Sequence, residues 1–232
     1  MCGRYTIAVS AEELLAEFGI EAPQFEPRYN VAPQQDVPVI GRNAQGAARF
    51  ALLRWGLVPG WARSPRDVKG TINARAETLL ERPSFREPFL HRRCLVVADG
   101  FYEWSRVGAV RQPWWFHLRS GRPFAFAGLW DSWSAEDGEK LFSCAIVTTR
   151  ADSVVAPVHD RMPVILDRAA RDQWLDPATG TATLERLLTP LDGASLGGHA
   201  VSTLVNSVAN DSPDCIEPVQ VPGTIAGGPV DG

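Results

Sequence analysis

Arg93–Trp104 reads RCLVVADGFYEW, and this stretch carries the clearest signal of the fold class. As far as Ala98 it is a run of apolar and β-branched residues, which is typical of a buried strand. Asp99 and Gly100 interrupt the run with a turn signal, and an aromatic segment follows. The stretch therefore predicts two successive β-strands separated by a short turn.

The neighbouring stretches repeat this pattern. Residues 113–133 (PWWFHLRSGRPFAFAGLWDSW) and 140–149 (KLFSCAIVTT) are apolar or alternating runs with glycine and charged turns between them. Further strands are predicted within 27–40, at 48–55 ahead of a Pro-Gly turn, and at 161–166. Strands that follow one another through short turns favour antiparallel pairing. We therefore predict the α+β class: a single domain with a mostly antiparallel, barrel-like β-sheet flanked by short helices.

The first of these short helices is predicted over 10–18. Ser10 and Glu13 have the spacing of a capping box, and Gly19 marks the end of the helix. Its buried stripe is expected to consist of Leu14, Leu15 and Phe18.

Three more helical segments and a last strand are predicted. The helices are predicted within 74–85, broken before Pro83; over 167–175, capped by Asp167; and over 182–188. The last strand covers 199–208. No linker or repeat divides the chain, so we expect one domain over 1–218 and a disordered tail over 219–232, where glycine and proline dominate.

Composition limits the possible classes of protein. The 232 residues are 45% hydrophobic, with no apolar run of eighteen and no secretory signal pattern, so neither a membrane span nor export is expected. Cys2, Cys94, Cys144 and Cys215 form no C-x-x-C pair or zinc spacing, and the last three are expected as small buried residues. The net charge is −4, yet residues 42–93 contain eleven Lys/Arg and four Asp/Glu. That local excess suits phosphate binding, although a genomic bias towards arginine explains it equally well.

Cys2 follows the initiating methionine, where a thiol is expected to be exposed. If Met1 is removed, Cys2 carries an amine and a thiol on adjacent carbons, with reference pKa values of ~7.7–8.0 and ~8.5. A 1,2-aminothiol captures aldehydes, because the amine forms an imine and the thiolate closes on it to give a thiazolidine. The thiol is equally suited to attack an amide with the amine as base. The alternative is a residue of no special role in a frayed terminus.

Three other residues are candidates for chemistry. Glu103 lies among aromatic residues in GFYEW, where burial raises a carboxyl pKa; the alternative is a surface carboxylate. His159 precedes a strand and suits proton transfer; the alternative is a structural histidine bonded to the backbone. Asn73 is predicted as a helix N-cap, with Arg75 in the first turn. An amide at that position also serves to orient a ligand.

Aromatic and arginine residues alternate in RWGLVPGWA (54–62) and the residues that follow. Trp61 near Arg54, Arg63 and Arg66 matches the composition of surfaces that stack bases and hold phosphates in single-stranded nucleic acid. The alternative is that these tryptophans belong to the core.

Taken together, seven stretches resemble the SOS-response-associated peptidase family. They are MCGRY (1–5), PRYNVAP (27–33), RWGLVPGWA (54–62), INARAET (72–78), GFYEW (100–104), HDRMPVIL (159–166) and VSTLVNSVANDSP (201–213). They occur in this order over nearly the whole chain, which makes the match specific.

The resemblance implies a protein that binds single-stranded DNA and captures an abasic site through a thiazolidine at Cys2, after autoproteolytic removal of Met1. It implies that Asn73 orients the reacting end of Cys2, that Glu103 moves protons, and that His159 assists opening of the sugar ring. A lyase side reaction belongs to the same chemistry. Positions matching phosphate or backbone contacts are Arg4, Asn30, Arg75 and Arg161.

Further expectations accompany this assignment. No cofactor, metal or membrane is expected; the partner is single-stranded DNA with an abasic site, and the protein is expected to be a cytoplasmic monomer, associated with the nucleoid when bound to DNA. Three alternatives stay open: a cysteine-dependent peptidase acting on other proteins, a non-covalent single-strand binder, and an amidotransferase with an N-terminal cysteine. The last would need glutamine-binding motifs that this sequence lacks.

Overall fold

The computed structural model describes residues 2–23, 25–43, 45–68, 71–107 and 110–220, and its central feature is a closed barrel. Five strands form the ring in the order β10-β4-β3-β6-β9, and β9 pairs with β10 to close it. Their bounds are β3 Asp36–Arg42, β4 Ala48–Trp55, β6 Arg93–Ala98, β9 Phe124–Ser134 and β10 Lys140–Arg150. All pairs in the ring are antiparallel except β10 with β4. The predicted antiparallel, barrel-like α+β fold is confirmed.

Short strands extend the barrel at its edges. β5 (Asn73–Arg75) runs parallel to the C-terminal half of β10, and β11 (Arg161–Pro163) pairs with the last residues of the same strand. β12 (Ile165–Leu166) pairs with β9. β5 and β11 converge at Thr148 of β10, which is in register with Arg75 and with Pro163. The motifs NARAET and HDRMP are thereby brought to one end of β10.

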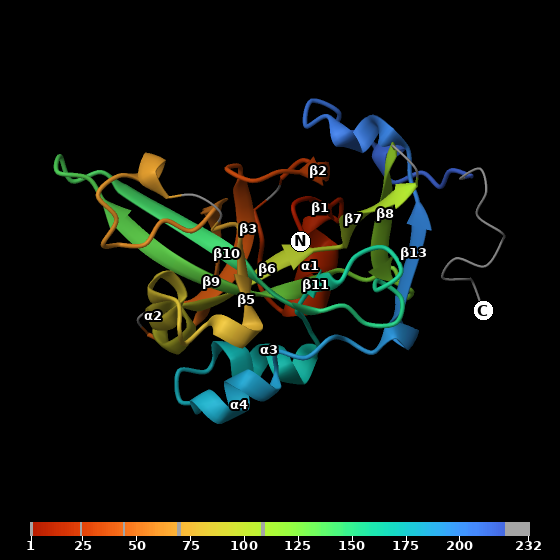
Figure 1. Ribbon diagram of the computed structural model, residues 1–232. Helices are drawn as coiled ribbons and strands as arrows, with labels where there is room; N and C mark the ends of the chain where they lie inside the picture. Colours follow the sequence, from red (N-terminus) through yellow and green to blue (C-terminus); the bar gives the residue numbers. More distant parts are fainter. Residues whose placement is uncertain (1, 24, 44, 69–70, 108–109, 221–232) are drawn as a thin grey trace.

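A second sheet of five strands packs beside the barrel, on the right in Figure 1. Its order is β13-β8-β7-β1-β2, with bounds β1 Tyr5–Ile7, β2 Arg28–Val31, β7 Gly100–Val107, β8 Val110–Leu118 and β13 Leu196–Ala200. β6 and β7 belong to different sheets, so the turn at Asp99 carries the chain from the barrel into the second sheet. RCLVVADGFYEW thus forms the predicted two strands and links the two layers.

Aromatic side chains fill the space between the layers. The Tyr5 ring lies 5.3 Å from Trp55 and 5.9 Å from Phe126, both edge-on, and Phe101 stacks on Phe116 at 5.3 Å. Such pairs contribute about 1 kcal/mol each beyond the area they bury. This packing fixes β1, the strand that follows Cys2, against the barrel.

Within the described residues, four short helices lie outside the sheets. They are α1 Ala11–Phe18, α2 Pro83–His91, α3 Arg168–Leu175 and α4 Thr181–Arg186. The predicted capping box of Ser10 and Glu13 is present in α1, and Asp167 caps α3. Leu14 is buried, but Leu15 is 46% exposed, so the buried stripe of α1 is narrower than predicted.

The helix predicted over 74–85 is wrong. Asn73–Arg75 is strand β5, Ala76–Thr78 is one 3-10 turn, and α2 begins at Pro83 instead of ending before it. Pairing with β10 outweighs the helical propensity of the alanine-rich segment, and proline suits the first position of a helix because its missing N–H has no partner there anyway.

The predicted last strand is shorter than expected. β13 ends at Ala200, and Thr203–Asn206 forms a 3-10 turn in which the Ser202 hydroxyl accepts from the Leu204 N–H. At the end of the predicted domain, the Val219 N–H donates to the Ala200 carbonyl at 2.9 Å. Of the predicted tail, residues 221–232 fall outside the described residues.

Candidate active site

Cys2 lies at the entrance to β1 and is fully buried, contrary to the expectation of an exposed thiol. The thiol donates to the Arg4 carbonyl at 3.7 Å. Burial, with the negative charge of Glu103 as a second contribution, raises the pKa of the Cys2 thiol well above its ordinary value. The thiol is therefore neutral at pH 7 in the chain that carries Met1, and a base is needed to activate it.

Asn73 holds the main chain of Cys2. Its Nδ2 donates to the Cys2 carbonyl at 2.8 Å, and the side chain is buried at the start of β5. The Oδ1 atom of this amide is buried and accepts no hydrogen bond from the described residues. Asn73 is thus a strand residue aimed at Cys2, and not the helix cap that its sequence predicts.

Glu103 and His159 face each other across the site. Glu103 lies on β7 and is 2% exposed, and burial raises the pKa of its carboxyl to about 7. Its Oε2 lies 3.9 Å from Nε2 of His159. A carboxyl whose pKa lies near neutrality is populated in both protonation states and can both accept and donate a proton.

The tautomer of His159 follows from its main-chain contact. Nδ1 accepts the Arg161 N–H at 2.9 Å, so the neutral ring carries its proton on Nε2, on the side of Glu103. Asp160 Oδ1 also lies 3.1 Å from Nδ1, but this carboxylate is largely in water, and the main-chain bond is the stronger constraint. Burial lowers the pKa of His159, which keeps the ring neutral at pH 7.

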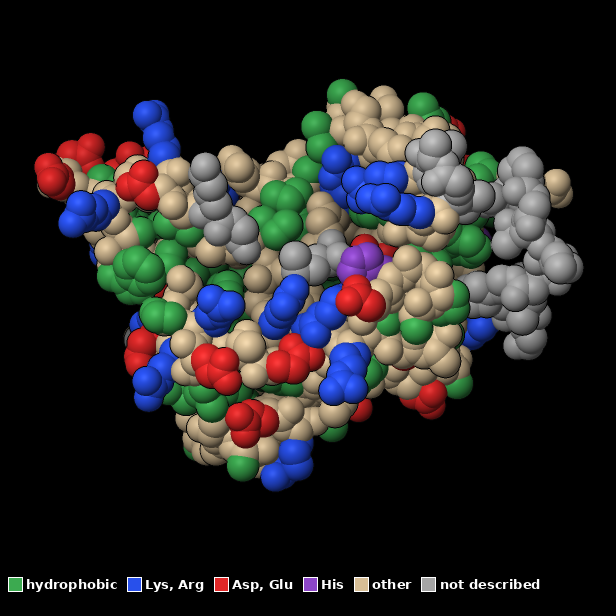
Figure 2. Space-filling view, in the orientation of Figure 1, with side chains coloured by type: hydrophobic (Ala, Val, Ile, Leu, Met, Phe, Trp, Pro, Cys, Tyr) green, Lys and Arg blue, Asp and Glu red, His purple; other side chains and the backbone are tan. Residues whose placement is uncertain are grey.

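A cavity of about 430 Å³ opens beside these groups. It is lined by Gly3, Arg4, Glu103, Trp104, Arg111, His159 and Asn206. Figure 2 shows Lys and Arg side chains above and below a histidine on this face. Cationic walls around an acid–base pair suit a substrate that carries phosphates.

Besides Gly3, three lining residues were not predicted from the sequence. Trp104 donates from Nε1 to Asn206 Oδ1 at 2.7 Å, and the Arg111 guanidinium lies 5.7 Å from the centre of its ring. Trp104 directly follows Glu103 in GFYEW, so the sequence could have indicated it as a residue of the site. Arg111 and Asn206 come from β8 and from the 3-10 turn after β13, and only the fold brings them to the site.

Arg4 and Asn30 form one buried network. Arg4 Nη1 donates to Asn30 Oδ1 at 2.7 Å and to the Val205 carbonyl at 2.8 Å. The Asn30 amide donates to the carbonyls of Val205 (3.2 Å), Ser207 (2.9 Å) and Asn210 (2.7 Å). Asn30 is fully buried, so it holds the 205–210 segment and the guanidinium of Arg4 in place from beneath the surface.

Replacing Asn30 with alanine is expected to lower the free energy of unfolding by about 3 kcal/mol, because several buried carbonyls and Arg4 lose their partner together. Urea unfolding measures the change. The matched control is Gln45→Ala, in an exposed turn, with an expected change within about 0.5 kcal/mol. A loss below about 1 kcal/mol for Asn30→Ala contradicts the role assigned to this amide.

Arg75 and Arg161 lie at the end of the site formed by β5 and β11. Arg75 is exposed. Arg161 donates to both carboxylate oxygens of Glu77, at 2.7 and 3.0 Å, and to the Thr148 carbonyl at 2.6 Å. These bonds with Arg161 lower the pKa of Glu77 and fix the guanidinium in one orientation.

The two tryptophans of RWGLVPGWA have different roles. Trp55 is fully buried in the barrel, whereas Trp61 is 67% exposed. Trp61 lines a second cavity of about 470 Å³ together with Arg63, apart from the one that contains Glu103. The structure thus brings Cys2, Asn73, Glu103, His159 and Arg4 together, and places Trp61 on a separate surface.

Two classes of feature are absent from the part of the chain that the structure describes. No three His, Cys, Asp or Glu side chains there gather in a way that would hold a metal ion. Within the same residues, no helix has the length and apolarity needed to cross a membrane.

Comparison with known proteins gives consistent matches along the chain. The family model described as "SOS response associated peptidase (SRAP)" matches residues 1–208. The chain is 41% identical to abasic site processing protein YoqW of Bacillus subtilis, over 94% of this chain and 99% of that one. It is 32% identical to abasic site processing protein HMCES of Gallus gallus, over 95% of this chain and 79% of that one.

Solved structures share the fold. A protein from Bacteroides thetaiotaomicron superposes with a TM-score of 0.86 at 27% identity, over 94% of this chain and all of that one. A phage-related protein from Bordetella bronchiseptica gives a TM-score of 0.71 at 29% identity, over 86% and 94% of the two chains. The family match over most of the length, and the relatives above 30% identity, show that this chain belongs to the SOS response associated peptidase family.

Proposed function

We propose that this protein captures abasic sites in single-stranded DNA through a thiazolidine formed by Cys2 after Met1 is removed. The observation that carries the proposal is the contact of Asn73 with the Cys2 carbonyl, beside an acid–base pair on the wall of a cationic cavity. The names of the relatives, abasic site processing proteins, support the same substrate. The protein would act as a monomer in the cytoplasm, on DNA of the nucleoid.

Removal of Met1 comes first, because an acylated nitrogen is not a nucleophile. Hydrolysis of the Met1–Cys2 amide by the protein itself would leave the free amine and thiol of Cys2 in the site. The Asn73 Oδ1 atom, which accepts no bond from the described residues, is an acceptor suited to that amine. Asn73 would then hold both the carbonyl and the nitrogen of Cys2, which directs the amine at the substrate.

The bond-forming steps release one water molecule. The Cys2 amine adds to the C1′ aldehyde of the open-chain deoxyribose to give a carbinolamine, which loses hydroxide together with a proton as water. The Cys2 sulfur then adds to the imine carbon, and the thiol proton ends on the nitrogen. An open imine leads to β-elimination of the 3′ phosphate, the lyase side reaction, and ring closure removes that imine.

Glu103 and His159 would move the protons in these steps. Glu103, with a pKa of about 7, can protonate the departing hydroxyl and accept the proton of the thiol. The neutral His159, with its proton on Nε2, can assist opening of the closed sugar by transferring a proton at its ring oxygen. The separation of 3.9 Å between the two side chains allows both to reach one substrate atom.

Arg4, Arg75 and Arg161 would contact the phosphates of the strand. Arg4 lines the cavity, Arg75 is exposed, and Arg161 is held by Glu77 near the surface. Asn30, which is buried, would act through Arg4 and the 205–210 segment and not through its own contact with the DNA. Affinity from such contacts is independent of sequence and falls with added salt.

Denaturing electrophoresis tests the proposal. Protein that begins at Cys2 is mixed with a single-stranded oligonucleotide containing one abasic site. A shifted band is expected with this DNA and not with the same DNA bearing a normal base, nor with protein whose amine is blocked by an N-terminal tag. If DNA binding persists without a shifted band, a non-covalent binder is the better account; cleavage of added proteins would favour a peptidase acting in trans.

Trp61→Ala is expected to weaken binding of unmodified single-stranded DNA about tenfold, because a stacked base is worth ~1–3 kcal/mol. Fluorescence anisotropy at one fixed salt concentration measures the affinity. Phe142→Ala removes a similarly exposed ring from β10 and is the control, with affinity expected to be unchanged. Equal losses in the two variants would remove the assignment of Trp61 to the strand-binding surface.

A further inference from the structure

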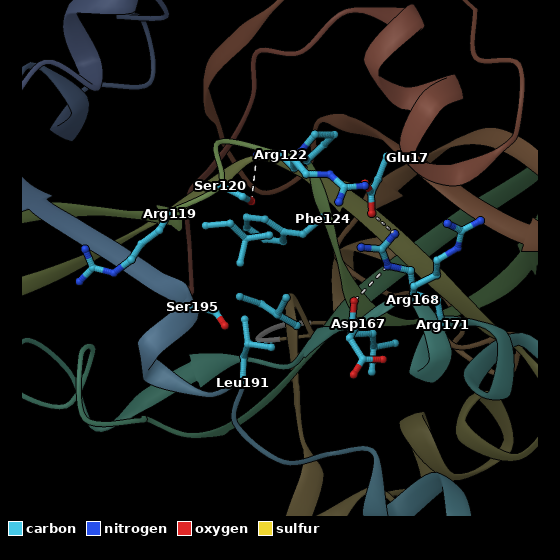
Figure 3. Close-up of a pocket in the computed structure, with 14 residues that line it drawn as sticks. Glu17, Arg119, Ser120, Arg122, Phe124, Asp167, Arg168, Arg171, Leu191 and Ser195 are labelled. Carbon is cyan, nitrogen blue, oxygen red and sulfur yellow. Dashed lines mark hydrogen bonds and ion pairs between the residues drawn. The ribbon is translucent and has the colours of Figure 1, made fainter. Parts of the chain in front are cut away.

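A third cavity, also lined by arginines, lies at the end of the second sheet opposite to the cavity that contains Glu103. It has a volume of about 410 Å³ and is formed by the end of α1, the turn between β8 and β9, and the junction of β12 with α3 (Figure 3). It shares no residue with the cavity that contains Glu103. Leu118, on its wall, is four residues along β8 from Trp114, which pairs with Glu103, so about 14 Å of strand separates the two sites.

The polar wall of this cavity is a buried ion pair. Arg171 Nη1 donates to Glu17 Oε1 at 2.7 Å, and the two side chains are only 9% and 8% exposed. Arg171 Nε donates to the Leu166 carbonyl at 3.0 Å, and its guanidinium lies 4.7 Å from the centre of the Phe18 ring. Such a pair is costly to bury unless its hydrogen-bonding groups are satisfied.

One donor of this pair is left for a ligand. The Nη2 atom of Arg171 has no acceptor among the described residues, and Figure 3 shows the third nitrogen of this guanidinium turned towards the cavity. The second oxygen of Glu17 is already bonded to Arg122. Both oxygens of Glu17 are therefore bonded, whereas a donor of Arg171 remains for a ligand, which favours an anion at this point of the cavity.

The mouth and floor of the cavity define the rest of the ligand. Arg122, which is 65% exposed and bonded to Glu17, and the exposed Arg168 belong to the lining. The lining contains four arginines and two carboxylates, those of Glu17 and Asp167, so its net charge is positive. The floor is apolar and includes Leu118, Phe124 and Leu166. No exposed aromatic ring lines the cavity on which a base would stack, which favours a peptide over a nucleic acid.

We propose that this cavity binds an acidic peptide segment of a partner protein, with an apolar side chain on the floor and a carboxylate on Arg171. Neighbouring carboxylates of the same segment would pair with Arg122 and Arg168. A carboxylate accepts two parallel, charge-assisted hydrogen bonds from a guanidinium. An apolar side chain buried on the floor of the cavity excludes water from the contact and adds binding energy. The site would attach the protein to another protein while Cys2 holds the lesion.

A fluorescein-labelled probe peptide, Glu-Glu-Asp-Leu-Phe with a free carboxyl terminus, tests the proposal by fluorescence anisotropy. Saturable binding is expected, with a loss of at least about tenfold in Arg122→Ala/Arg168→Ala. Arg186→Ala, on an exposed face of α4, is the matched control and should bind as the unchanged protein does. The substituted side chains are exposed and lie outside the cavity that contains Glu103, so capture of abasic DNA should be the same in all three proteins.

Two other probes identify the recognised group. The neutral peptide Gln-Gln-Asn-Leu-Phe with an amidated terminus is expected to bind at least about tenfold more weakly, because it lacks the carboxylates that the arginines recognise. Equal binding of this neutral peptide, or no binding of the acidic one, would overturn the proposal. Displacement of the peptide by an octathymidine, with loss of octathymidine binding in Arg122→Ala/Arg168→Ala, would assign the cavity to DNA and also overturn it.

Discussion

Cys2→Ser is expected to lose the stable DNA–protein crosslink while the amine still reacts with the abasic site. The serine variant can form the imine, but its hydroxyl is a far weaker nucleophile than a thiol and does not give a ring of comparable stability. The imine then persists, and β-elimination at the 3′ phosphate follows. On a denaturing gel, the shifted band of the unchanged protein should be replaced by a cleaved oligonucleotide.

The control for this prediction is another cysteine of the same chain. Cys215 is buried beside Asn210, outside the cavity that contains Glu103, and Cys215→Ser should crosslink as the unchanged protein does. A Cys2→Ser variant that holds abasic DNA as durably as the unchanged protein would contradict the thiazolidine. Cys2→Leu adds a branched apolar side chain without a nucleophilic oxygen, and its crosslink should be absent as well.

Glu103→Gln is expected to slow crosslink formation about a hundredfold and to remove the part of its pH dependence centred near pH 7. The isosteric amide keeps the shape of the site but neither accepts nor donates a proton in this range, and general acid–base catalysis contributes ~10²–10⁴-fold. The rate is measured by quenching into denaturant between pH 5 and 9. A variant with an unchanged pH profile would assign the proton transfers to another group.

The same substitution is expected to stabilise the fold at high pH. Below pH 4.5, the ordinary pKa of a glutamate, the carboxyl is protonated in both the folded and the unfolded chain, and its burial carries no ionisation penalty. As the pH rises from 4.5 to about 7, the unfolded chain ionises before the folded one, so stability falls. The full loss in the free energy of unfolding, reached above pH 7, is on the order of 3 kcal/mol for a pKa shift of this size.

Glutamine does not ionise, so its burial carries no ionisation penalty. Glu103→Gln should therefore unfold at a higher urea concentration than the unchanged protein at pH 8, and at a similar concentration near pH 4.5. Glu81→Gln, at an exposed position, is the control and should show no such pH-dependent gain. A glutamate retained at a cost in stability is typical of a group selected for its chemistry. Equal stability of the two proteins at pH 8 would show that the carboxyl of Glu103 is not held at a raised pKa.

The strands of the barrel could be predicted because their apolar runs are long and separated by turns. Arg93–Ala98 is buried throughout, and Lys140–Arg150 is buried over 143–149, where the apolar run of the sequence lies. The alanine-rich segment after Asn73 was predicted incorrectly because its structure depends on pairing with β10, more than seventy residues away in the chain. Short strands held by distant partners leave no local signal.

The residues of the candidate site show the same difference between local and distant signals. Glu103 and His159 were identified from their local surroundings, and the structure places them 3.9 Å apart. The burial of Cys2 was not foreseen, since nothing in MCGRY shows that Asn73 and the strand it starts would enclose the terminus. Asn206 reaches the site because Asn30 and Arg4 hold its segment in place, through contacts across more than 170 residues.

The most direct test of the central claim is tandem mass spectrometry of the crosslinked product after nuclease and trypsin digestion. Trypsin releases Cys2–Arg4 from the amino terminus, and the account predicts that this tripeptide, without Met1, carries the deoxyribose remnant. The modification should have the mass of the aldehyde minus one water and should block both the amine and the thiol of Cys2. An adduct on any other residue, or on a peptide that still begins with Met1, would contradict the claim that the freed aminothiol of Cys2 captures the abasic site.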